Sequence, residues 1–289
     1  MKMVMKTVFF SVVYPSVEPF LSDFFQSLEM QTSRDFSIVL VNDGVVDVER
    51  FLERFNPARI TILKSGASPV ENRMIGIRHA LKTGAEYLVF GDSDDFFSAN
   101  RVETSVELLG AGWDVVVNDL TAVDSAGEGI DSNYLSRRVE DGAEIDFPFI
   151  RDKNLFGLSN TAVRTSLLKG AEAPHDLVAV DWYLFSALLR EGCRAVFTSK
   201  ACTFYRQHDA NTVGVGALEE DAVVAQLDAK VRHYQAMQYD DVSLYESTLK
   251  GLRHQPKLIP EYVDYLKRHA KETPLWWENI LPWKKCYEM

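Results

Sequence analysis

Short hydrophobic runs alternate along the first 120 residues with segments in which hydrophobic side chains recur every three or four positions. The runs are rich in β-branched and aromatic residues and show no polar–apolar alternation, which indicates strands buried on both faces of a sheet. The intervening segments have the spacing of amphipathic helices. We expect strands at residues 7–14, 37–41, 60–64, 87–90 and 114–118, and helices at residues 18–32, 48–55, 70–82 and 100–109.

Strands and helices that alternate in this order are typical of an α/β fold with a doubly wound, mainly parallel sheet flanked by helices. The pattern is less regular over residues 119–160, and a helix at 181–191 and a strand at 195–205 follow. Residues 217–249 have the spacing of one or two amphipathic helices, and residues 256–289 are rich in proline and aromatic residues. We therefore expect a C-terminal helical extension of the α/β domain.

The composition excludes several classes of protein. With 289 residues, of which 46% are hydrophobic, the chain has enough apolar side chains to build a core, which excludes disorder. No apolar run approaches the roughly 20 residues that cross a bilayer. Two lysines precede the first apolar run, as in a signal peptide, but no small-residue cleavage site follows, so we expect a buried strand there. Three scattered cysteines fit neither a disulfide framework nor a zinc site and indicate a reducing, cytoplasmic environment.

The net charge of −11 disfavours nucleic acid as a partner, because binding to phosphates requires clustered basic residues. The charge is unevenly distributed: residues 250–289 hold eight Lys/Arg and five Asp/Glu, a net of +3, so the first 249 residues carry −14. In this basic tail, Trp276, Trp277 and Trp283 lie among lysines and arginines. Such a mixture is typical of peripheral membrane contact. It is also typical of a tail that packs on its own domain or on a second copy of the chain, and the sequence leaves these alternatives open.

Carboxylates follow two of the predicted strands. Asp43 comes after the second strand, and Asp92, Asp94 and Asp95 come after the fourth. Ligands of open α/β sheets bind at the carboxyl ends of the strands, and clustered carboxylates there suit Mg²⁺ or Mn²⁺. The alternative interpretation is that Asp95 caps the next helix and that Asp92 and Asp94 are solvated.

The order of these features resembles that of the family 2 glycosyltransferases, whose nucleotide-sugar-binding fold is called GT-A. The segments that carry the resemblance are EPFLSDFFQSLEMQTSRDFSIVLVNDG and SPVENRMIGIRHALKTGAEYLVFGDSDD, which end in the two acidic turns. The resemblance is strong over residues 7–120 and weak over residues 155–215. Two positions depart from the family pattern: Val13-Tyr14-Pro15-Ser16 replaces Pro-x-Tyr-Asn, and Met74 replaces an asparagine, although Asn72 lies close by.

The resemblance implies roles for four residues on the donor side. Asp43 matches the acid that contacts the nucleotide base, and Arg73 matches the arginine near the base and the diphosphate. Asp92 and Asp94 match the Asp-x-Asp pair that handles the ribose and a divalent metal, Mn²⁺ or Mg²⁺. A metal ion and an arginine suit a diphosphate leaving group, because both offset its growing negative charge.

The resemblance also implies a catalytic base in the segment VAVDWYLFSALLREG. Asp181 matches the acid that deprotonates the acceptor hydroxyl, with Val180 in place of the family's glutamate. Taken without the resemblance, Asp181 is an ordinary helix cap. His175 is the rival candidate for the base.

The segment Tyr205-Arg206-Gln207-His208 resembles the family's Tyr-Arg-x-His. It implies that Arg206 clamps the diphosphate and that His208 binds metal or phosphate, whereas the alternative is a solvated loop. Gly214 and Gly216 follow this segment, and we expect them to permit a mobile lid.

These inferences predict a metal-dependent, inverting glycosyltransferase that moves a sugar from a nucleotide diphosphate sugar to a hydroxyl acceptor, a growing surface glycan or glycolipid. We expect residues 1–120 to bind the donor, residues 121–216 to bind the acceptor and supply the base, and residues 217–289 to form the extension. One alternative is a catalytically degenerate member that binds a nucleotide or serves as a scaffold. Another is a sugar nucleotidyltransferase, which the absence of glycine and basic residues from positions 13–18 disfavours.

Overall fold

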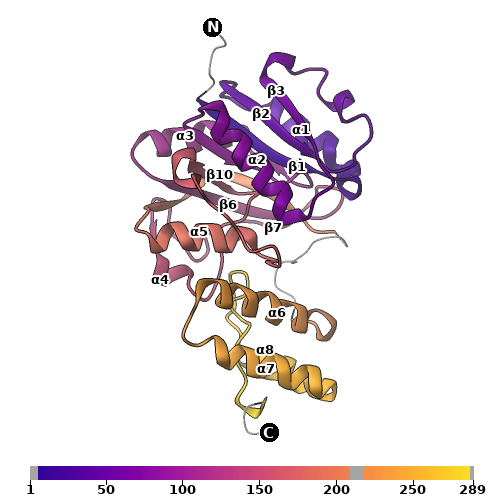
Figure 1. The fold of residues 1–289 in the computed structure, drawn as a ribbon, viewed down its shortest axis with the longest axis vertical. Coiled ribbons are helices and arrows are strands. Elements are labelled where there is room, and N and C mark those ends of the chain that lie inside the picture. Colours follow the sequence, from indigo (N-terminus) through magenta and orange to yellow (C-terminus); the bar gives the residue numbers. More distant parts are fainter. Residues whose placement is uncertain (1–5, 209–217, 287–289) are drawn as a thin grey trace.

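The computed structural model describes residues 6–208 and 218–286 (Figure 1). Its centre is a ten-stranded sheet in the order β3-β2-β1-β4-β9-β6-β10-β5, with β7 beside β6 and β8 beside β10. The strands are β1 (Thr7–Val13), β2 (Phe36–Asn42), β3 (Ile60–Lys64), β4 (Tyr87–Phe90), β5 (Phe96–Phe97), β6 (Val115–Val123), β7 (Gly129–Asp131), β8 (Glu144–Ile145), β9 (Thr161–Arg164) and β10 (Ala195–Arg206).

Helices cover both faces of this sheet, and a group of helices extends below it in Figure 1. The α-helices are α1 (Leu21–Glu29), α2 (Pro69–Thr83), α3 (Arg101–Gly110), α4 (Phe147–Ile150), α5 (Val180–Arg190), α6 (Glu220–Met237), α7 (Val242–His254) and α8 (Ile259–His269). Short 3₁₀ helices are at Pro15–Phe20, Val48–Phe51, Pro57–Arg59, Thr165–Leu168, Pro256–Leu258 and Lys284–Cys286.

The strand directions bring the acidic turns together. β1 pairs in parallel with both β2 and β4, and β6 pairs in parallel with β10, whereas β9 lies antiparallel between β4 and β6. The carboxyl ends of β1, β2 and β4 therefore meet at one edge of the sheet. The α/β fold with flanking helices is confirmed, but the sheet is mixed rather than mainly parallel, because β5, β7, β8 and β9 pair antiparallel with their neighbours.

Side chains of β1 alternate between two hydrophobic cores. Val8 and Phe10 join the core under α2 and α5, while Phe9 and Val13 join the core under α1 and α3. The close approach of α2 requires a glycine at position 76, because a Cβ there would lie 2.0 Å from the Phe10 ring. This packing on both faces explains the uninterrupted hydrophobic strands in the sequence.

Several predicted elements differ from those observed. Residues 48–55 form only a 3₁₀ turn at Val48–Phe51, and residues 18–32 divide into a 3₁₀ helix that contains Pro19, followed by α1. The strand expected at 114–118 extends to Val123 as β6. β9 was not expected, and the expected lid at residues 214–216 lies outside the described residues.

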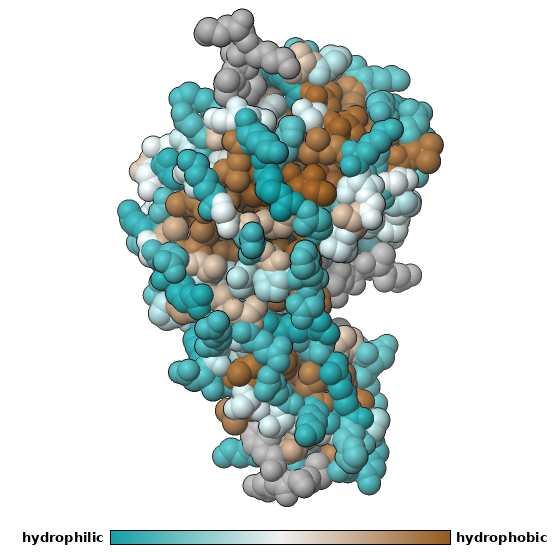
Figure 2. Space-filling model, in the orientation of Figure 1, coloured by the Kyte–Doolittle hydropathy of each residue, from teal (hydrophilic) through white to brown (hydrophobic). Residues whose placement is uncertain are grey.

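The C-terminal extension consists of α6, α7 and α8 and a segment that returns to the domain. Its helices show mostly hydrophilic residues on the face in Figure 2. Trp276 and Trp277 are each only 9% exposed. Trp276 packs near Tyr134 and Tyr205, and Trp277 stacks on Trp182. Of the alternatives for the tail, packing on its own domain accounts for both indoles, and neither is available to lipid.

Within residues 6–208 and 218–286, no helix is both long and apolar enough to cross a membrane.

Candidate active site

A cleft of about 470 Å³ opens at the edge of the sheet where β1, β2 and β4 end. Five of the predicted site residues line it: Asp43, Arg73, Asp92, Asp94 and Asp181. Asp43, Asp92 and Asp94 follow strands, Arg73 lies on α2, and Asp181 lies in the first turn of α5. The cleft therefore brings together carboxylates from the two halves of the chain.

Local contacts fix the turn that carries Asp92 and Asp94. The Ser93 hydroxyl donates a hydrogen bond to the Val12 carbonyl at 2.7 Å, which ties the turn to the end of β1. Asp95 is buried, and its carboxylate accepts hydrogen bonds from the Ser159 hydroxyl and the Arg206 backbone N–H. Asp95 therefore holds the turn from within, and it does not cap α3. Asp92 and Asp94 line the cleft.

Asp94 and His208 form a pair suited to a divalent cation. His208 Nε2 lies 3.1 Å from Asp94 Oδ2, and the His208 ring rests on Phe20. This contact is a hydrogen bond or ion pair between an imidazole nitrogen and a carboxylate oxygen, and both are atoms that can bind Mn²⁺. Within residues 6–208 and 218–286 no group of three or more His, Cys, Asp or Glu residues is arranged to hold a metal. The chemistry of this pair therefore fits an ion whose other ligands are diphosphate oxygens and water.

Arg206 lies behind the acidic turn rather than among the residues that line the cleft. Its side chain is 1% exposed, and its guanidinium donates hydrogen bonds to Asp94 O, Ser125 O and Asp23 Oδ2 at 2.7–2.9 Å. The planar group also rests over the ring of Phe20. In this arrangement Arg206 braces the turn, and its donors are directed to the protein rather than to a diphosphate.

Two carboxyl groups of the turn, those of Asp92 and Asp95, have a raised pKa, chiefly because they are buried. Burial, reinforced by Asp94, raises the pKa of Asp92 to about 7, although Arg73 opposes the shift. Burial and the same neighbours raise the pKa of Asp95 well above its usual range. Without a cation the turn therefore carries less negative charge at neutral pH than its three carboxyl groups imply.

Arg101 supports the turn from the core. The side chain is fully buried, donates a hydrogen bond to Asn118 Oδ1 at 2.9 Å and to the Phe90 carbonyl, and lies against the Phe97 ring. Burial lowers its pKa to about 9, so the guanidinium is cationic at neutral pH. The sequence pattern did not single out this residue, because an arginine at the start of an amphipathic helix is ordinarily exposed.

Asn72 orients Asp43. Its side-chain amide donates to Asp43 Oδ2 at 2.8 Å, and its own oxygen accepts a hydrogen bond from the Ser65 hydroxyl. Met74, which stands where the family has asparagine, is buried in the core. The amide of Asn72 therefore reaches the site from a position two residues earlier on α2.

Asp181 has the environment of a carboxylate with limited access to water. Its carboxylate accepts a hydrogen bond from the Trp182 N–H at 2.8 Å and from the Asn154 amide at 3.4 Å. Burial raises its pKa to about 6, and the Trp182 N–H and the charge of Arg73 limit that rise. The rival candidate, His175, is exposed and does not line the cleft.

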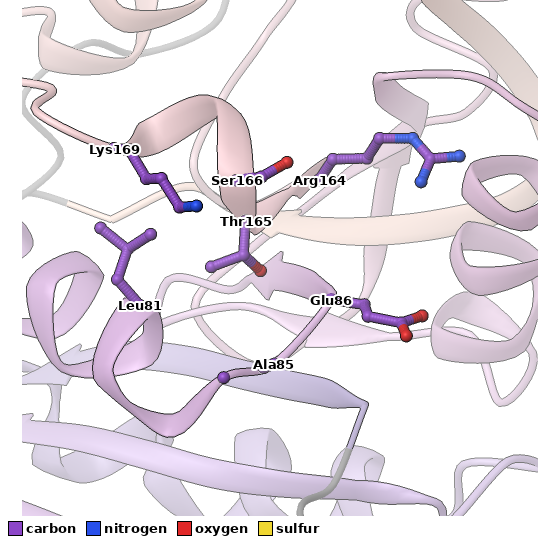
Figure 3. Close-up of a pocket in the computed structure, with 8 residues that line it drawn as sticks. Leu81, Ala85, Glu86, Arg164, Thr165, Ser166 and Lys169 are labelled. Atoms are coloured by element: carbon purple, nitrogen blue, oxygen red, sulfur yellow. The ribbon is translucent and has the colours of Figure 1, made fainter.

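A second hollow of about 320 Å³ lies at the opposite end of β4, between the end of α2 and the 3₁₀ helix Thr165–Leu168. In Figure 3, Lys169 extends toward Thr165 and Leu81, whereas the charged groups of Arg164 and Glu86 point away from them. No residue singled out by the sequence lines this hollow.

A sequence profile described as "Glycosyl transferase family 2" matches residues 10–169, more than half of the chain. The chain belongs to glycosyltransferase family 2. The matched range includes Asp43, Arg73, Asp92 and Asp94 and ends before Asp181. The comparison with curated proteins found no match.

Solved structures of glycosyltransferases share the fold. TarS of S. aureus in complex with UDP-GlcNAc is 17% identical, with a TM-score of 0.62 over 93% of this chain and 82% of that one. The mannosyltransferase PcManGT of Pyrobaculum calidifontis, solved with GDP-Man and Mn²⁺, is 14% identical, with a TM-score of 0.58 over 93% of this chain and 76% of that one. GalNAc-T7 with UDP, GalNAc and Mn²⁺ is 11% identical, with a TM-score of 0.60 over 94% of this chain and 59% of that one. These likenesses establish the GT-A fold for this family member.

Proposed function

We propose that this glycosyltransferase transfers a sugar from a nucleotide diphosphate sugar to a hydroxyl acceptor with inversion, and that it requires a divalent metal. The observation that carries the proposal is that Asp43, Arg73, Asp92 and Asp94 line the same cleft as Asp181. A donor and an acceptor bound side by side require such an arrangement.

The first set of residues serves the donor. Asp43, oriented by Asn72, accepts hydrogen bonds from the nucleotide base, and Asp92 accepts them from the ribose hydroxyls. Arg73 directs its positive charge at the diphosphate. Asp94 and His208 would hold Mn²⁺ or Mg²⁺, which supplies further positive charge to the leaving group when bound.

Asp181 serves as the general base. Its carboxylate takes the proton of the acceptor hydroxyl as that oxygen forms a bond to the anomeric carbon. The bond from the same carbon to the diphosphate breaks on the opposite side, and the diphosphate leaves with the electron pair. One displacement of this kind inverts the configuration at the anomeric carbon. A pKa of about 6 leaves Asp181 mostly ionised at neutral pH and still basic enough to accept a proton.

Arg206 enters this proposal as a positioning residue. Because its guanidinium donates to Asp94 O and to Asp23, it holds the turn on which Asp92 and Asp94 are carried.

We assign residues 1–120 to the donor side, residues 121–216 to the acceptor side and base, and residues 217–289 to the extension. The acceptor in this proposal is a growing surface glycan or glycolipid. The free cysteines among the described residues support a reducing compartment, so we place the reaction in the cytoplasm, at the inner face of the membrane where such an acceptor is lipid-linked.

The test is release of nucleoside diphosphate from UDP- and GDP-sugars with Mn²⁺, with Mg²⁺ and with EDTA. We expect release with at least one donor and its loss in EDTA. Tight binding of a nucleoside diphosphate without turnover of any donor under either metal would instead identify a degenerate, nucleotide-binding member of the family.

A further inference from the structure

The chain after α8 returns to the cleft as residues 273–280, here called the returning segment. Its backbone is held by side chains of the domain and of α6. Arg138 and Tyr134 donate hydrogen bonds to the carbonyls of residues 273 and 274 at 2.8 and 2.7 Å. Lys230, which is fully buried on α6, donates to the Trp277 and Ile280 carbonyls at 3.0 and 2.9 Å. The segment is therefore fixed at both ends.

The returning segment is also joined to the residue that contacts Asp181. The Asn154 backbone N–H donates to the Trp276 carbonyl at 3.0 Å, which makes an isolated β-bridge. The Asn154 side chain in turn donates to Asp181 Oδ2 at 3.4 Å. On the other side, Trp277 stacks on Trp182, the neighbour of Asp181, with ring centroids 5.2 Å apart. The segment thus supports the candidate base through two independent contacts.

Trp276 and Trp277, two successive residues of this segment, both line the cleft, although consecutive residues of an extended chain point in opposite directions. The backbone of Trp277 makes this possible with a φ of +62°, a left-handed conformation that is costly for a bulky side chain. The hydrogen bonds from Lys230 to the same residue and to Ile280 hold it in place. Strain of this kind at a cleft indicates that the position of both rings matters.

The wall that these indoles complete differs from the donor side of the cleft. It includes Tyr205, against whose ring Trp276 packs edge-on, and the apolar residues that precede Asp181: Leu177, Val178, Ala179 and Val180. The same cleft is also lined by Asp43, Asp92 and Asp94. A neutral pyranose presents an apolar face of C–H groups and a rim of hydroxyl groups, which matches an aromatic wall that ends in a carboxylate. An anionic sugar would meet the charge of Asp181 and of the acidic turn.

We propose that Trp276, Trp277 and Tyr205 form the acceptor subsite, and that its ligand is a neutral sugar ring with one hydroxyl directed at Asp181. This inference rests on the proposed function and adds to it the acceptor class and the dependence of the site on the returning segment.

The test uses the full chain and compares Trp276→Leu with Trp283→Leu. Trp283 belongs to the same tail but packs against Tyr262 and Tyr265 of α8, away from the cleft. The probes are methyl glycosides of glucose, galactose, mannose and N-acetylglucosamine, with methyl glucuronide as the anionic counterpart. Release of nucleoside diphosphate is measured with and without each glycoside.

In the wild type, we expect at least one neutral glycoside to stimulate release and methyl glucuronide to stimulate it at least tenfold less. Trp276→Leu should raise the half-saturating glycoside concentration at least tenfold. Its half-saturating donor concentration, measured without glycoside, should stay within twofold of the wild type, because Trp276 is not among the residues assigned to the donor. Trp283→Leu should resemble the wild type in every respect.

Equal half-saturation by the glycoside in Trp276→Leu and Trp283→Leu would overturn the inference, as would stimulation by the glucuronide alone or by no glycoside. These results differ from failure of the proposed function, in which the wild type releases no nucleoside diphosphate from any donor. If Trp276→Leu loses its fold, the milder Trp276→Phe repeats the comparison. It should give a smaller increase in half-saturation in the same direction, and no increase would again overturn the inference.

Discussion

Asp181 lies where three influences on its protonation oppose one another. Burial favours the neutral acid, while the Trp182 N–H and the positive charge of Arg73 favour the carboxylate. The outcome is a pKa of about 6, which is higher than that of an exposed aspartate by about two units. At the residue scale, burial raises the pKa of both Asp92 and Asp181, and the nearby positive charge of Arg73 opposes both shifts.

The pKa of Asp181 predicts the pH dependence of transfer. Because the base must be ionised, we expect turnover at saturating metal to fall below about pH 6, by about tenfold per pH unit. Asp181→Asn should lower turnover by at least about 100-fold and remove this acidic limb. Both are measured from initial rates of nucleoside diphosphate release with acceptor.

A thermal melt of Asp181→Asn is the control for folding. A carboxyl group whose pKa rises on folding binds more protons in the folded state, so its ionisation destabilises the protein as pH rises through about 4 to 6. The neutral amide avoids this cost, and the variant should therefore melt no lower than the wild type at pH 7.5. An unchanged pH profile in the variant would remove Asp181 from its proposed role.

The pairing of Asp94 with His208 predicts that both side chains contribute to the affinity for the metal. Asp94→Asn and His208→Gln should each weaken binding of Mn²⁺ in the presence of UDP by about tenfold or more. Isothermal titration calorimetry measures this directly. Asp240→Asn, at an exposed position between α6 and α7, is the matched control and should bind Mn²⁺ as the wild type does. Wild-type affinity in Asp94→Asn would contradict the assignment.

At the scale of elements, the pattern of hydrophobic residues predicted which strands are buried on both faces of the sheet. β1, β2 and β4 are mainly hydrophobic runs without polar–apolar alternation. The rule that ligands bind at strand ends then predicted that Asp43 and Asp92 lie at one site. β9 has only four residues, Thr-Ala-Val-Arg, and a run this short does not predict a strand from its pattern. Its place between β4 and β6 depends on pairing with both neighbours, which no local pattern encodes.

The parts of the site that the sequence did not predict also depend on contacts between residues far apart in the chain. Asn154 belongs to a loop whose conformation depends on the Trp276 carbonyl from the far end of the chain. The resemblance to the family motif led us to expect that Arg206 contacts the diphosphate. The sequence does not show that its guanidinium donates hydrogen bonds to Asp94 O and to Asp23 instead. Asn72 was recognised only as a neighbour of Arg73, since its contact with Asp43 requires the geometry of α2 against β2.

Gly91 joins β4 to the acidic turn, and its close packing predicts the effect of adding a single methyl group there. A Cβ at Gly91 would lie 2.4 Å from the Phe9 ring and 2.8 Å from that of Phe97. Gly91→Ala should therefore cost about 1–3 kcal/mol of stability and shift the turn, with weaker binding of Mn²⁺ and UDP. Urea unfolding and calorimetry measure the two effects.

Gly110→Ala is the control with the opposite sign. Gly110 ends α3, and the nearest atom to an added Cβ is the Tyr87 hydroxyl oxygen at 4.0 Å. Alanine has the higher helix propensity, so this variant should be neutral or more stable by up to about 1 kcal/mol. Equal effects of the two substitutions would show that the crowding at Gly91 does not position the turn.

On the scale of the whole molecule, the α/β domain and the extension are joined by buried polar contacts as well as by aromatic packing. The Glu278 side chain is 1% exposed and accepts hydrogen bonds from Arg138 of the domain, from Lys271 and from the Leu275 N–H. Lys230 provides the second connection through carbonyl groups of the returning segment. The tail is therefore an integral part of the fold rather than an appendage.

Glu278 predicts how this connection responds to acid. Burial alone would raise its pKa, but the hydrogen bonds from Arg138 and Lys271 hold it at about 2. An acid whose pKa falls on folding stabilises the protein above its unfolded pKa of about 4.5, and this contribution is lost as pH falls toward 2. The contribution is about 3 kcal/mol. Tryptophan fluorescence of wild type and Glu278→Gln between pH 5 and 2 should show a weaker pH dependence of stability in the variant, and identical curves would contradict the assignment.

The stack of Trp182 and Trp277 also has an optical consequence. Two indoles with centroids 5.2 Å apart and planes inclined by 18° couple their electronic transitions. Such a pair produces an exciton band in circular dichroism that neither ring has alone. One ring belongs to α5 and the other to the returning segment, so the band exists only while the tail is docked. The circular dichroism of the unlabelled protein therefore reports whether the returning segment is packed on α5. It can be measured while donor and acceptor are added.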